Sequence, residues 1–142
     1  MALYEIVQRS FYLFNIFQSL LPLLKQAAEA NSDKPLGATR AAVINMSSVL
    51  GSIAQNDQGG FYPYRCSKAA LNAATKSMSI DLKKEAILVA SMHPGWVKTD
   101  MGGKNAPLDV DSAVSGIFAT IEKLGEADTG KFVQYDGTEL PW

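Results

Sequence analysis

Histidine and cysteine are nearly missing from this chain, which has one of each, His93 and Cys66, among 142 residues. A single cysteine excludes an internal disulfide framework and suits a reducing compartment, so we expect a cytoplasmic protein. A structural zinc site needs several Cys or His ligands. We therefore expect no bound metal.

Runs of basic residues are also missing. The net charge of -1 comes from 13 basic and 14 acidic residues, which makes nucleic acid and anionic membrane surfaces poor partners. The apolar stretch at residues 11–24 is too short to span a bilayer and contains Asn15 and Gln18. We expect no membrane association.

What the chain does have is an alternation of helical and strand patterns within the length of one domain. Strands are expected at 41–48, 86–94 and 131–137, and helices at 3–30, 62–84 and 109–124. This order predicts an α/β fold, a doubly wound sheet of three parallel strands with helices on both faces. The first helix is apolar on most faces, so we expect it to be buried on more than one side.

Tyr64 and Lys68 lie four residues apart in the segment FYPYRCSKAAL and share one face of the expected helix. Tyr62 has Cys66 at that spacing instead. A phenol is a poor acid at neutral pH, but an adjacent ammonium favours phenolate and assists proton transfer. The alternative is an aromatic ring packed on the aliphatic stem of a lysine.

Two further groups lie at expected strand ends. Ser47 and Ser48 close the first strand, and Pro94-Gly95, followed by Thr99, closes the second. Ligands of open α/β sheets bind outside the carboxyl ends of the strands, so these groups can face a substrate carbonyl or a cofactor. Each also has a local interpretation, because such hydroxyls often bond backbone groups and Pro-Gly stops a strand.

Together, N-x-S-S at 45–48, Y-x-x-x-K at 64–68 and P-G-x-x-x-T at 94–99 resemble the C-terminal half of a short-chain dehydrogenase/reductase. The resemblance covers nearly the whole chain and is strongest to sniffer-like carbonyl reductases and C-factor proteins. It implies a partial Rossmann-type domain. It also implies hydride transfer between NADPH, or NADH, and a ketone or aldehyde.

The resemblance further implies a role for each matching residue. Ser48 would orient and polarise the substrate carbonyl, Tyr64 would be the general acid, and Lys68 would assist Tyr64 and bond the nicotinamide ribose. The residues that would hold the nicotinamide carboxamide are Pro94, Gly95, Val97 and Thr99.

Two family features have no match here. The glycine-rich turn T-G-x-x-x-G-x-G, which binds the cofactor pyrophosphate, is not found. We therefore expect residues 1–142 to form the C-terminal catalytic portion of the domain, without its dinucleotide-binding half. The family's catalytic asparagine also has no counterpart, because counting back from Pro22 leads to Arg9, and Asn15 lies too far along the helix.

A truncated, inactive chain that acts at most as an interaction protein is therefore the alternative to an active reductase. The expected partners are a small carbonyl or alcohol substrate and further copies of the chain, in a homodimer or tetramer formed through the long helices. A Ser-His-Asp hydrolase is not expected, because no G-x-S-x-G turn is present. Cys66 faces a different side of its helix from Tyr64 and is expected to pack.

Overall fold

A computed structural model describes residues 2–142, with side chains from residue 15 onward. The predicted alternation of helices and strands is present. The elements in chain order are α1 (Ala2–Ala30), β1 (Ala42–Met46), η1 (Val49–Gly51), α2 (Tyr62–Asp81), η2 (Lys83–Glu85), β2 (Leu88–His93), α3 (Val110–Ile121), η3 (Glu126–Asp128), β3 (Phe132–Gln134) and β4 (Glu139–Leu140).

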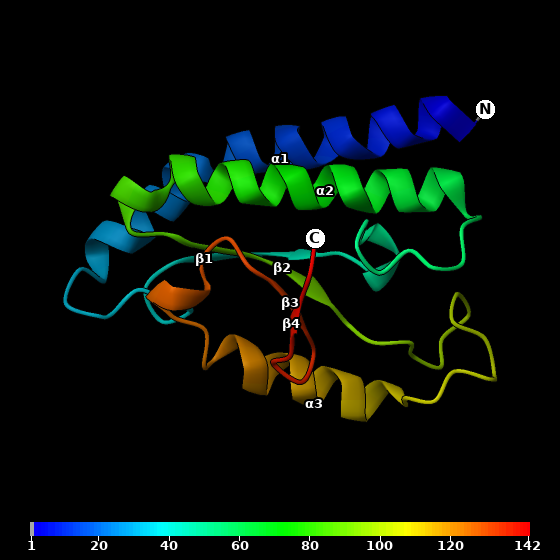
Figure 1. Ribbon diagram of the computed structural model, residues 1–142. Coiled ribbons are helices and arrows are strands. Elements are labelled where there is room, and N and C mark those ends of the chain that lie inside the picture. The colour runs from blue at the N-terminus through cyan, green and yellow to red at the C-terminus, as the bar shows by residue number, and fades with distance from the viewer. Residues whose placement is uncertain (1) are drawn as a thin grey trace.

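The sheet has the strand order β1-β2-β3-β4, and both the β1–β2 and β2–β3 pairs are parallel. Helices α1 and α2 lie side by side over one face, and α3 covers the other (Figure 1). This three-layer arrangement is a partial Rossmann-type α/β fold, and the predicted fold class is confirmed.

The fourth strand, β4, was not predicted and runs antiparallel to β3. The turn that joins them places Gly137 at φ 87°, and the Asp136 carboxylate accepts the Thr138 N–H at 3.0 Å. Asp-Gly is a strong hairpin signal. The sequence therefore carried a sign of this hairpin, and the prediction was incomplete because the strand beyond the turn has only two residues.

Strand β2 is the centre of the core, and all six of its residues are buried. Its side chains alternate between the faces, as the two-residue period of a strand requires. Leu88, Ala90 and Met92 pack on the side of α3, whereas Val89 packs with α1 and α2. This pattern explains why apolar residues occupy both faces of the strand, which is interrupted only by Ser91 and His93.

A buried polar cluster joins α2 to the sheet. The Thr75 hydroxyl accepts a hydrogen bond from Asn45 Nδ2 at 2.9 Å and one from Ser91 at 3.0 Å. It donates its own hydrogen to the carbonyl of Leu71 at 2.8 Å. Buried polar groups cost little once they are paired, so this cluster fixes how α2 sits on the ends of β1 and β2.

Helix α1 is buried on one side only in the part whose side chains are described. Phe17, Leu21 and Leu24 pack against the core, whereas Leu20 and Leu23 are 46% and 60% exposed. The prediction of burial on more than one side is wrong for residues 15–30, because the sheet and α2 cover only its inner face. Within residues 2–142, no helix is both long and apolar enough to cross a membrane.

Candidate active site

The carboxyl ends of β1 and β2 meet at one edge of the sheet. Met46 is paired with Met92, and the Ser47 N–H donates to the Met92 carbonyl at 2.7 Å. The first turn of α2 and the loop that follows β2 lie at the same end of the molecule (Figure 1). The sequence motifs therefore converge where an open α/β sheet binds its ligands.

Tyr64 and Lys68 face each other on α2, as their spacing predicts. The Lys68 ammonium nitrogen lies 5.8 Å from the centre of the Tyr64 ring, and it donates to the Met46 carbonyl at 2.8 Å. Both side chains are partly buried. The lysine thus links the tyrosine to the end of β1, two residues before Ser48.

The two adjacent serines have different surroundings. Ser47 is buried and donates to Asn72 Oδ1 at 2.6 Å. Ser48 caps η1, where its hydroxyl oxygen accepts the Leu50 N–H at 3.2 Å. Because Ser48 Oγ acts there as an acceptor, its own hydrogen is available to donate to a carbonyl. This difference favours Ser48 over Ser47 for substrate contact.

Gly51 brings η1 into close contact with α2. A Cβ at this position would lie 2.7 Å from Lys68 Cβ and 2.8 Å from the Lys68 carbonyl carbon. No side chain fits at such distances without movement of the loop or the helix. The glycine therefore keeps the segment after Ser48 against the helix that carries Tyr64 and Lys68.

Replacing Gly51 with alanine is expected to lower the free energy of unfolding by about 1–3 kcal/mol, because the added methyl meets backbone as well as side chain. Denaturant unfolding measures the change. Gly125→Ala is the matched control, since the nearest atom to its Cβ is 3.8 Å away, and a change within about 0.5 kcal/mol is expected there. Equal losses in both variants would contradict the close-contact argument.

The Pro94-Gly95 turn is a compact loop. Gly95 has φ 86°, and a Cβ there would lie 2.9 Å from Leu108 and 3.0 Å from the Tyr135 ring. The loop returns on itself, with Val97 paired to Leu108. Thr99 is exposed, and its hydroxyl accepts the Gly102 N–H at 3.1 Å.

The residues named for the nicotinamide therefore stand on one ordered loop beside the end of β2. The structure places them there, and their assignment to a cofactor stays a prediction.

His93 ends β2 and is buried. Burial lowers the pKa of His93, and the nearby Asp136 carboxylate opposes part of that change. Its Nδ1 has no hydrogen-bond partner in the part of the chain with described side chains. A neutral imidazole in this position suits packing beneath the Pro94 turn.

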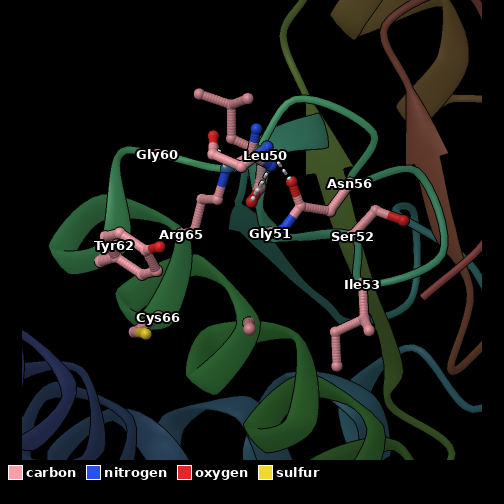
Figure 2. Close-up of a pocket in the computed structure, with 11 residues that line it drawn as sticks. Leu50, Gly51, Ser52, Ile53, Asn56, Gly60, Tyr62, Arg65 and Cys66 are labelled. Atoms are coloured by element: carbon pink, nitrogen blue, oxygen red, sulfur yellow. Dashed lines mark hydrogen bonds between the residues drawn. The ribbon is translucent and has the colours of Figure 1, made fainter.

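A hollow of about 260 Å³ lies between the first turns of α2 and the loop of residues 50–60, and neither Tyr64 nor Lys68 lines it (Figure 2). It is lined by Leu50, Gly51, Ser52, Ile53, Asn56, Gly59, Gly60, Tyr62, Arg65, Cys66 and Ala69. Cys66 is exposed there. The prediction that Cys66 packs is therefore wrong, because its side chain borders the open hollow between α2 and the loop of residues 50–60.

The side chain of Arg9, the proposed counterpart of the family asparagine, lies outside the described residues. Arg65 was not among the residues predicted to matter for the site. The structure buries it, with only 8% of the residue exposed. A weak signal existed, because Arg65 shares a helix face with Ala69 and Asn72, at spacings of four and seven residues.

Comparison with known proteins identifies the family. Residues 11–108 match the family model for short chain dehydrogenases. The chain is also 43% identical over 127 residues to the C-signal protein of Myxococcus xanthus, covering 89% of this chain and 70% of that protein. The chain therefore belongs to the short-chain dehydrogenase family of oxidoreductases.

Among solved structures, the chain is similar to carbonyl reductases. The carbonyl reductase Sniffer of D. melanogaster is 60% identical and superposes with a TM-score of 0.88, over 89% of this chain and 51% of that one. The NADPH-bound carbonyl reductase from chicken fatty liver is 39% identical with a TM-score of 0.81, again over 89% and 51%. The chain thus spans about half the length of these carbonyl reductases.

Proposed function

We propose that these residues form the substrate side of an NADPH-dependent carbonyl reductase that reduces a ketone or aldehyde. The observation that carries the proposal is the position of Lys68, which contacts the Tyr64 ring and the Met46 carbonyl together. Through these contacts the tyrosine, the lysine and the Ser48 turn occupy one end of the sheet. The solved carbonyl reductases of the same fold support the reaction class.

In this proposal each side chain has one task. The Ser48 hydroxyl donates to the substrate carbonyl oxygen, since its own oxygen already accepts the Leu50 N–H. Tyr64 donates a proton to that oxygen as negative charge develops on it. Lys68 places positive charge beside the phenol ring, which stabilises the charge left on Tyr64.

The described residues suit the nicotinamide end of a cofactor better than its phosphates. NADPH would supply the hydride when bound, and the loop containing Pro94, Gly95, Val97 and Thr99 would hold the nicotinamide at the end of β2. For the pyrophosphate the fit is poor. The N-terminus of α3 is already occupied by the Asp109 carboxylate, which accepts the Ser112 N–H at 2.8 Å, and no glycine turn joins a described strand directly to a long helix.

A chimera tests the proposal. In it, this chain replaces the matching segment of the D. melanogaster Sniffer carbonyl reductase, to which it is 60% identical where the two align. The chimera is expected to oxidise NADPH when supplied with a ketone or aldehyde, and the absorbance of NADPH reports the rate. A chimera that folds and binds NADPH but reduces no member of a carbonyl panel would contradict the proposed reaction.

The second candidate is an inactive chain that acts through interactions, and the exposed apolar face of α1 favours it. NADPH titration separates the two functions. Because the described residues fit the pyrophosphate poorly, the isolated 142-residue chain should bind NADPH at least about 100-fold more weakly than the chimera, which corresponds to about two hydrogen bonds to a charged group. Equal affinity would show that these residues suffice for the cofactor, and would favour the reductase.

A further inference from the structure

Arg65 is a buried cation held by backbone carbonyls. It is 8% exposed, and its Nε donates to the Gly59 carbonyl at 3.3 Å while its Nη1 donates to the Leu50 carbonyl at 3.3 Å. Within the part of the chain whose side chains are described, no carboxylate pairs with it. A buried charge is costly unless it is hydrogen-bonded, so these two loop carbonyls are what retain the guanidinium inside the molecule.

The Leu50 carbonyl is one end of a short chain of contacts that begins at Ser48. The Leu50 N–H donates to Ser48 Oγ at 3.2 Å, and the Gly51 N–H donates to the Ser48 carbonyl at 2.7 Å. Leu50 is thus bonded to Ser48 through its N–H and to Arg65 through its carbonyl. Arg65 directly follows Tyr64 on α2.

The second bond of Arg65 fixes the other end of the same loop. Gly59 and Gly60 both have φ 66°, and the chain enters α2 through Phe61 at φ 48° without a side-chain cap. Arg65 reaches from the first turns of α2 to the Leu50–Gly51 turn (Figure 2). One guanidinium therefore holds both ends of the segment between Ser48 and Tyr64.

We propose that Arg65 is a positioning residue, which fixes Ser48 relative to Tyr64 by clamping the loop between them. The inference rests on the proposed reductase function and adds a residue that touches neither substrate nor cofactor. The planar fork of arginine can bond two carbonyls in fixed directions, whereas lysine offers a flexible point charge. Misplacement of a reacting group by about 1 Å can cost about 100-fold in rate, so loss of the clamp should affect chemistry more than binding.

Hydrogen exchange on the 142-residue chain tests the clamp without any catalysis. In Arg65→Met the amides of Leu50, Gly51 and Ser52 should exchange about tenfold faster or more, while amides of β2 keep their protection. Arg65→Lys should give an intermediate effect. Lys76→Met is the matched control, since Lys76 is a cation on the same helix that donates to the distant Gly130 carbonyl at 3.4 Å.

Two results would overturn the clamp. Unchanged exchange at residues 50–52 in Arg65→Met would show that the guanidinium does not hold this turn. A uniform rise in exchange across β2 as well would show that Arg65 supports the whole domain. If Arg65→Met does not fold, Arg65→Lys and Arg65→Gln give the same comparison, provided that their melting temperatures match that of the unsubstituted chain.

A double-mutant cycle in the chimera tests whether Arg65 acts through Ser48. Arg65→Met should lower kcat about 10- to 100-fold when Ser48 is present, and less than about threefold in the Ser48→Ala background, with the KM for NADPH unchanged in both. Equal losses in both backgrounds would show a purely structural role. If the unsubstituted chimera reduces no carbonyl, the proposed function fails, and the exchange experiment still decides the clamp.

Discussion

Replacing Tyr64 with phenylalanine in the chimera is expected to lower kcat for carbonyl reduction by about 10²–10⁴-fold, the usual contribution of a general acid. The reason is local. Phenylalanine keeps the ring that lies 5.8 Å from the Lys68 nitrogen, so the substitution removes the hydroxyl alone. Steady-state kinetics at saturating NADPH measure the effect, and the affinity for NADPH should stay within about threefold.

Tyr62→Phe is the matched control for this experiment. Tyr62 lies two residues away on the same helix, is 75% exposed, and lines the hollow, which Tyr64 does not. Removing its hydroxyl should leave kcat unchanged. If Tyr64→Phe reduced kcat less than threefold, or if Tyr62→Phe reduced it equally, Tyr64 would not be the acid and the lysine would have another partner.

The coarse fold was predictable because its signals are short-range. The apolar residues of β2 mark a buried strand, and the helix expected at 109–124 is present as α3, which Asp109 caps. The end of α2 was placed three residues too late, at residue 84, because the usual stop signal is missing. A left-handed residue commonly ends a helix and is usually glycine. Here α2 ends at Asp81, and Ala86 takes the left-handed conformation after η2, at φ 53°.

The candidate site was predictable only in part. The spacing of Tyr64 and Lys68 fixes their shared helix face, and the structure brings them together. The bonds of Arg65 to Gly59 and Leu50 depend on how a loop folds back over a helix, and no periodic pattern encodes that path. The exposure of the outer face of α1 was also not predicted. The sequence does not show whether an apolar residue is covered by its own chain or by another protein.

That outer face suggests how copies of the chain associate. Ile16, Leu20 and Leu23 are spaced for one helix face and are 58%, 46% and 60% exposed. A large apolar stripe on a helix usually marks a contact with another protein. The outer edge of β1 has fewer backbone groups available for pairing with a second copy, because Lys68 already donates to the Met46 carbonyl. We therefore propose a homodimer in which α1 of one copy packs on α1 of the other.

Leu20→Lys is expected to weaken this self-association at least about tenfold, because burying one leucine is worth about 2 kcal/mol and a charge cannot replace it. Sedimentation equilibrium of the 142-residue chain measures the dissociation constant. Gln18→Lys is the matched control, since it adds the same charge at an exposed position on another side of the helix and should leave association unchanged.

The same experiment distinguishes self-association through the α1 face from self-association through the edge of β1. In a parallel strand, alternate residues direct their backbone groups to opposite sides. The Ala41 carbonyl and the Ser47 N–H bond to β2, so the N–H of Ala42 points to the free edge, and Ala42→Pro removes a donor there without breaking the ladder. Association that survives Leu20→Lys but is lost in Ala42→Pro would show that copies join through β1. A monomer at every concentration would contradict both modes, and would leave the apolar face of α1 for a different partner.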